Sequence, residues 1–93
     1  MSNEIPRSVT MTATKIDGRI VITVEGQSAV PKTVRYELRV TGASATRHSG
    51  RTWLGVDRRI LSQVSVIESA ADCAILTVDE GDRTSYEDRV CLS

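Results

Sequence analysis

The sequence predicts an all-β fold, a small antiparallel β-sandwich of about seven strands, and three observations point there. The aliphatic side chains are mostly β-branched, with eleven Val and seven Ile against five Leu and no Phe, and such side chains pack well on pleated sheets. Short alternating runs of apolar and polar residues recur, with turn signals about every ten residues. No segment of helical length shows a convincing 3.6-residue period.

The first two strands flank Asp17-Gly18, a pair suited to the tight type I′ turn of a β-hairpin. Pairing Ile16 with Arg19 fixes the register of this hairpin. One face then carries the apolar pairs Met11 with Val24 and Ala13 with Ile22. The other face carries Thr10, Thr12, Thr14, Thr23 and Glu25. One apolar and one polar face are what a half-buried antiparallel sheet requires.

A third strand begins at about Thr33, after the loop 26–32, because Pro31 cannot donate to a ladder. Strict alternation predicts an inward set of Val34, Tyr36, Leu38 and Val40 and an outward set of Arg35, Glu37 and Arg39. Gly42 ends this run. Residues 43–47 are predicted to form a short edge strand, and Ser49-Gly50 a turn.

The last three strands are predicted over residues 58–67, 71–78 and 84–92. In the first of them the expected inward set is Ile60, Val64 and Val66, and Leu61 fits only through a bulge or a second apolar contact. Residues 79–82 form the turn of the closing hairpin. Seven short strands so spaced favour an immunoglobulin-like sandwich in one domain spanning 1–93, and we expect residues 1–7 to be flexible.

Charge is balanced overall, with twelve basic and twelve acidic residues, so nucleic acid or an anionic membrane finds no net attraction. Its distribution along the chain is uneven. Residues 32–59 have a balance of +5 and residues 60–93 a balance of −5. The sequence therefore predicts a strong charge dipole, or a basic patch beside an acidic one. No run approaches the roughly 18 apolar residues of a membrane span.

Catalytic and metal chemistry find little support in the sequence. His48 is the only histidine and lies in a polar segment where a solvated surface side chain is the default. Glu80 and Asp82 are interpreted as ordinary turn formers. A Gly-rich phosphate loop, a metal-spaced cluster and a Cys-x-x-Cys motif are all missing from the sequence. We predict that the protein is not an enzyme and needs no cofactor.

The two cysteines and the single tryptophan each allow two interpretations. Cys73 and Cys91 lie directly opposite each other if a five-residue turn joins their strands, whereas a tighter turn pairs Cys73 with Arg89; a disulfide and two free thiols both fit. Trp53 is interpreted as a plug in the core rather than as an interaction hot spot.

The outward arginines also have two interpretations. Charged side chains guard exposed strands against edge-to-edge aggregation. Alternatively, Arg35, Arg39, Arg47 and Arg51 form one patch on neighbouring strands, with guanidinium groups suited to carboxylates. Such a patch would attract an acidic partner and hold it loosely.

Three segments in order resemble the CsgH branch of the CsgC-like curli chaperones, and the resemblance runs from about Val9 to Leu92. They are Arg35-Tyr36-Glu37-Leu38-Arg39-Val40, Arg47-His48-Ser49-Gly50-Arg51 and Ile60-Leu61-Ser62-Gln63-Val64-Ser65-Val66. These chaperones are small periplasmic immunoglobulin-like proteins that keep the amyloid subunits of curli fibres from polymerising inside the cell. The chain departs from the pattern where His48 replaces an expected Gln and where the Cys-x-Cys pair of the CsgC branch is missing, so redox chemistry is not transferred to Cys73 and Cys91.

The resemblance implies an ATP-independent inhibitor of amyloid polymerisation that acts in the periplasm after loss of a signal peptide. Its expected partner is an amyloidogenic curli subunit, bound weakly and through charge, and we expect a monomer that binds neither nucleic acid nor membrane. The expected client-binding residues are Arg35, Glu37, Arg39, Arg47 and Arg51. The main alternative is a generic immunoglobulin-like adhesion module that recognises a folded protein through loops near Trp53; a small-ligand carrier is a second.

Overall fold

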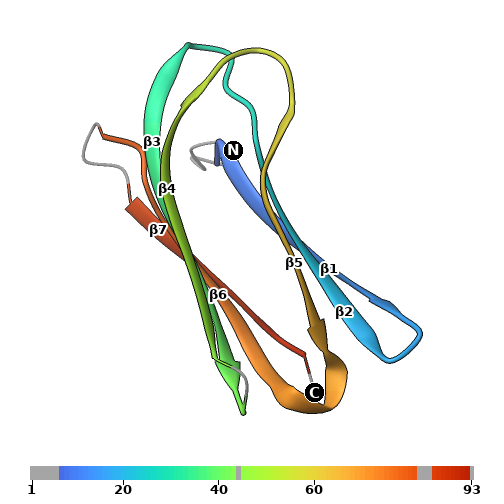
Figure 1. Ribbon diagram of the computed structural model, residues 1–93. Coiled ribbons are helices and arrows are strands. Elements are labelled where there is room, and N and C mark those ends of the chain that lie inside the picture. The colour runs from blue at the N-terminus through green and yellow to red at the C-terminus, as the bar shows by residue number, and fades with distance from the viewer. Residues whose placement is uncertain (1–6, 44, 82–84, 93) are drawn as a thin grey trace, which may run out of the picture.

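A computed structural model describes residues 7–43, 45–81 and 85–92 as two antiparallel sheets that face each other (Figure 1). The smaller sheet has the order β1-β2-β5, with β1 (Val9–Ile16), β2 (Arg19–Gly26) and β5 (Arg59–Ile67). The larger sheet has the order β4-β3-β6-β7, with β3 (Lys32–Gly42), β4 (Thr46–Leu54), β6 (Ala71–Asp79) and β7 (Ser85–Cys91). A short 3-10 turn, η1 (Glu68–Ala70), joins β5 to β6. The predicted seven-stranded antiparallel sandwich is confirmed. In the described ranges no helix is long and apolar enough to cross a bilayer.

The core fills the space between the sheets with branched aliphatic side chains. Alternate residues of β2 and β3 supply a large part of it, with the facing that the pattern predicts: Ile20, Ile22, Val24, Val34, Leu38 and Val40 are all buried. Tyr36 packs against this cluster and its hydroxyl donates a hydrogen bond to the carbonyl oxygen of Leu61, 3.0 Å away on β5. This bond satisfies the half-buried phenol and connects the two sheets.

The first hairpin has the predicted register, with Ile16 opposite Arg19. Asp17 and Gly18 have φ values of 48° and 78°, as a type I′ turn needs. The register places Ala13 on the core side of the sheet, yet residues 12–19 are all exposed. Figure 1 shows the hairpin tip extending away from the larger sheet. On the inner face of this end, Ile20 and Ile22 of β2 stay buried, whereas their partners Lys15 and Ala13 on the edge strand β1 are exposed.

The prediction for β5 was half right. A register shift between Val24 and Glu25 of β2 pairs these residues with Ser62 and Ile60 and leaves Leu61 as the extra residue of a bulge. Leu61 packs against the core, as expected if the strand bulges there. The bulge reverses the facing of the residue before it, so Ile60 is 62% exposed. Our placement of Ile60 in the core was wrong.

The prediction for β4 was wrong in its bounds. Ser49-Gly50 is no turn but lies in the middle of a nine-residue edge strand that pairs with β3 from Thr46 to Leu54. Gly50 lies opposite Tyr36, and a Cβ atom built on it would come within 2.9 Å of the Tyr36 hydroxyl. Gly50 is therefore glycine because an aromatic ring occupies its side-chain space. His48 is exposed, as predicted.

The closing hairpin pairs Asp79 with Ser85, so residues 80–84 form a five-residue connection. This length brings Cys73 directly opposite Cys91, and the two cysteines form a disulfide. Residues 82–84, including Asp82, lie outside the described residues. So do residues 1–6 of the segment that we expected to be flexible; Arg7 is ion-paired with Asp88.

Candidate functional site

All five side chains expected to bind a partner lie on one surface, the outer face of β3 and β4. Because β3 and β4 pair without a shift, Arg35 lies directly opposite Arg51 and Arg39 directly opposite Arg47. Glu37, between the two arginine rows, lies opposite Ser49. We call the surface formed by Arg35, Glu37, Arg39, Arg47 and Arg51 the arginine face.

The two arginine pairs of this face differ in their surroundings. The Glu37 carboxylate is 3.5 Å from Nε of Arg47 and 3.8 Å from Nε of Arg39, so it bridges that pair. No carboxylate of the described residues forms an ion pair with Arg35 or Arg51. Arg39 and Arg47 thus share one carboxylate, which offsets one of their two charges, while Arg35 and Arg51 offer guanidinium donors that no described carboxylate pairs with.

Asp79 is the carboxylate best placed to neutralise Arg35, because the β3–β6 register sets the two residues opposite each other. Its Oδ1 atom instead accepts a hydrogen bond from the backbone N–H of Gly81, at 2.8 Å. Aspartate commonly closes a turn by accepting from the backbone two residues on. The demands of the β6–β7 turn therefore help to leave Arg35 uncompensated.

An open hollow of about 370 Å³ lies beside the Arg35–Arg51 pair, on the side of Glu37 and Ser49. Its lining comprises Arg35, Tyr36, Glu37, Ser49, Gly50, Arg51, Thr77 and Asp79. A second hollow, of about 220 Å³, is lined by Thr33, Arg35, Arg51, Asp79 and Gly81. Arg35 and Arg51 line both hollows, so this pair stands between two depressions in the sheet surface.

The strand order of the larger sheet places the arginine-bearing strands β3 and β4 beside β6 and β7, whose outer face holds Asp79, Glu87 and Arg89. On the outer face of this sheet Ile75 is only 6% exposed although it lies outside the core cluster. It lies between Arg39 on β3 and Arg89 on β7, whose aliphatic stems can cover an apolar neighbour while their charges stay in water.

Trp53 does not plug the core, so that prediction was wrong. Its side chain belongs to the outer set of β4, two residues beyond Arg51, and the residue is 56% exposed. The signal for this was in the sequence, since residues 47, 49, 51 and 53 share one face of an unbroken strand. Placing a turn at Ser49-Gly50 hid it.

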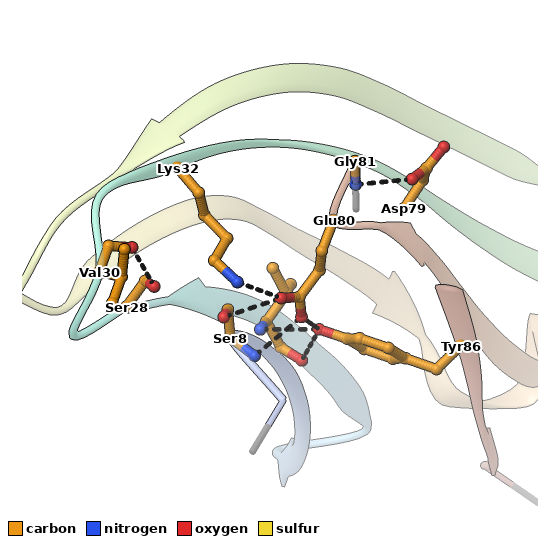
Figure 2. A network of polar contacts seen from close by, with 9 residues as sticks. Ser8, Ser28, Val30, Lys32, Asp79, Glu80, Gly81 and Tyr86 are labelled. Carbon is orange, nitrogen blue, oxygen red and sulfur yellow. Dashed lines mark hydrogen bonds and ion pairs between the residues drawn. The ribbon is translucent and has the colours of Figure 1, made fainter. Parts of the chain in front are cut away.

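A second polar centre, missed from the sequence, surrounds Glu80 (Figure 2). Glu80 is 4% exposed and no ordinary turn former. Its carboxylate accepts hydrogen bonds from the Tyr86 hydroxyl at 2.6 Å, from the Lys32 ammonium at 3.0 Å, and from the N–H and hydroxyl of Ser8 at 3.1 Å each. The Tyr86 hydroxyl in turn accepts from the N–H of Val9 at 3.0 Å. This network fastens the start of β1 to the larger sheet.

The network shifts two pKa values. Burial alone would raise the pKa of Glu80, but the hydrogen bonds from Tyr86, Lys32 and Ser8 outweigh it, and the pKa lies below its ordinary value. Burial and the bond to Glu80 raise the pKa of Tyr86. Glu80 therefore stays ionised and Tyr86 stays a donor, which suits a structural junction more than proton transfer.

The comparisons with known proteins bear on the fold. No family model matches the chain, and no curated protein does. Among solved structures, the E. coli curli protein CsgC matches with a TM-score of 0.64 at 13% identity, over 88% of this chain and 95% of the other. The chain has a CsgC-like fold. R. palustris CsgH, solved in solution, matches with a TM-score of 0.61 at 15% identity, over 90% of each chain.

Proposed function

We propose that this protein is an ATP-independent periplasmic chaperone that delays the amyloid polymerisation of curli subunits through weak, charge-guided binding. The observation that carries the proposal is the arginine face, an exposed set of guanidinium groups gathered on one sheet of a fold shared with CsgC and CsgH. Guanidinium groups bind carboxylates well, and in water such contacts are transient.

The physical requirements of such an inhibitor are modest. Conversion to amyloid needs unpaired strand edges of disordered chains to meet in register. A twisted sheet that holds part of such a chain against its face delays this meeting, and charged side chains on its own edge strand keep it from acting as a template. Neither ATP nor an enclosed cavity is needed for this mode of action.

The disulfide supports the proposed compartment. Disulfides persist in oxidising environments such as the bacterial periplasm and are rare in the cytosol. The Cys73–Cys91 bond joins neighbouring strands and suits a protein that works where curli subunits pass on their way out.

The direct test is the growth of thioflavin fluorescence from a purified curli subunit with sub-stoichiometric amounts of this protein. We expect a longer lag time at low salt and a shrinking effect as salt rises, because ionic contacts on a solvated face are screened. A lag time equal to that of the subunit alone at low salt would reject the function.

The exposure of Trp53 favours one rival, an adhesion module that binds a folded partner through an aromatic contact. The two functions predict opposite effects of the W53A substitution and of salt concentration. Under the chaperone proposal W53A leaves the longer lag time in place while high salt removes it. Under the adhesion proposal, W53A abolishes partner binding and salt has little effect.

A further inference from the structure

We propose that Arg35 and Arg51 together form a binding site for a single carboxylate, the side chain of one Asp or Glu in an extended peptide segment. The Arg39–Glu37–Arg47 triad, in this view, contributes little because its two guanidinium groups already share the Glu37 carboxylate and keep only one net positive charge. The inference rests on the proposed function, and it deepens that function by naming the half of the arginine face that takes the client and the chemical group that it takes.

Like charges directly opposite each other on paired strands destabilise a sheet, so an uncompensated Arg35–Arg51 pair is a local cost. The matching pair further along each strand, Arg39 and Arg47, is partly compensated by Glu37. The two pairs share the same strands and the same face. They differ in that only Arg39 and Arg47 have a described carboxylate within ion-pair distance, so an anion from another molecule would gain more at Arg35 and Arg51.

The geometry suits one carboxylate. Side chains of directly opposed residues start about 5 Å apart at their Cβ atoms, so two guanidinium groups on long stems can approach one carboxylate from two sides. Each guanidinium presents several N–H donors in a planar fork, and a carboxylate has two oxygens to accept them. Both arginines are exposed, which keeps the site open to a segment arriving from solvent.

The two hollows beside the pair indicate what should flank the carboxylate. In an extended segment, side chains two positions away lie about 7 Å along the strand on the same face, and the hollows lie on either side of Arg35 and Arg51. Glu37 lines one hollow and Asp79 lines both. The favoured segment therefore has one acidic residue with uncharged side chains two positions before and after it, because acidic flanks would meet these carboxylates.

The test uses the full chain, labelled with nitrogen-15, and a blocked nine-residue peptide of Ser, Thr and Gly with one central Glu. Titration should shift the Nε–H signals of Arg35 and Arg51 and leave those of Arg39 and Arg47 nearly still. The same peptide with a central Gln should bind about tenfold more weakly or not at all, since a charge-assisted bond is lost.

Matched variants decide the assignment. R35Q/R51Q should lose peptide binding by about tenfold or more, whereas R39Q/R47Q should keep it. E37Q frees the second pair, so the signals of Arg39 and Arg47 should begin to move with the Glu peptide. Equal losses in the two double variants, or no movement in E37Q, would overturn the inference. Backbone spectra of each variant report that the fold is intact.

The outcomes separate the two proposals, because peptide binding is measured without any amyloid. Binding at Arg35 and Arg51 with no effect on a curli subunit would remove the proposed function and keep the site. If R35Q/R51Q still lengthened the lag time and R39Q/R47Q did not, the proposed function would stand and the binding site would be Arg39 and Arg47.

Discussion

Glu80 joins three segments that are far apart in the sequence, and it does so from a buried position. A buried carboxylate is tolerated only when hydrogen bonds and a counter-charge compensate it. Lys32 supplies the charge, and Ser8 and Tyr86 supply further donors (Figure 2). The start of β1, an edge strand, is thereby held to the larger sheet.

E80Q should lower the free energy of unfolding at neutral pH by about 1–3 kcal/mol, because the charged acceptor of this network is removed. The folded-state pKa of Glu80 lies below its ordinary value of 4.5. Its contribution is therefore complete above pH 4.5 and is lost as pH falls through the folded pKa. Urea unfolding across this range should show a shallower pH slope in E80Q than in the wild type.

Glu87 provides the control, since it is exposed on β7 and forms no ion pair with the described residues. E87Q should leave both the stability and its pH slope almost unchanged. If E80Q and E87Q behaved alike, the Glu80 network would not hold the sheets together.

At the level of the strands, the end of β3 depends on Gly42. This residue has a φ of 132°, and a Cβ atom there would lie 2.4 Å from the carbonyl oxygen of Ala70 in η1. The bulge between Val40 and Gly42 brings the two segments this close. Only glycine, which has no Cβ atom, fits where the end of β3 approaches η1 this closely.

G42A should therefore destabilise the protein by about 2–4 kcal/mol, because both the backbone conformation and the space exclude a methyl group. G18A is the matched control. Gly18 also has a positive φ, of 78°, but apart from its chain neighbours none of the described residues has an atom within 4 Å of its added Cβ. G18A should lower the free energy of unfolding by only about 1–2 kcal/mol. Thermal unfolding of the two variants measures the difference, and equal losses would contradict the steric account.

The disulfide fastens the edge strand β7 to β6 across a sequence separation of 18 residues. Its removal should lower the free energy of unfolding by about 3 kcal/mol, mainly through the greater freedom of the unfolded chain. Urea unfolding with and without a reductant tests this in the wild type. C73A/C91A should show the lowered stability and no response to reductant; a wild type that unfolds identically in both conditions would exclude a stabilising role.

The strands differ in how well their sequences predict them. The first hairpin is predicted by its Asp17-Gly18 turn and by alternating apolar and polar residues, and β3 by such alternation alone. In both, the side chains alternate regularly between the two faces of the sheet. For β4 the Ser49-Gly50 pair suggested a turn, since the sequence alone could not show the Tyr36 ring above Gly50. That error hid the outward facing of Trp53. In β5 a bulge at Leu61 was one of two predicted alternatives, but its effect on Ile60 was not foreseen.

On the scale of the molecule, the sheet order turns a charge pattern along the chain into a pattern in space. Residues 32–59 and 60–93 carry opposite balances of +5 and −5, and the pairing of β3 with β6 sets basic and acidic strands side by side. The members of the arginine face were predicted from the sequence. Its division into a pair that shares a carboxylate and a pair that has none was not, because that depends on where Glu37 and Asp79 point.

The arginine face is the central claim, and charge reversal tests it most directly. R35E/R39E reverses two charges on this face, and K15E/R19E makes the same change in net charge at the exposed tip of the β1–β2 hairpin. Lag times of a curli subunit in thioflavin fluorescence should fall to the uninhibited value with R35E/R39E and stay long with K15E/R19E, both variants being folded. Undiminished inhibition by R35E/R39E would contradict the account.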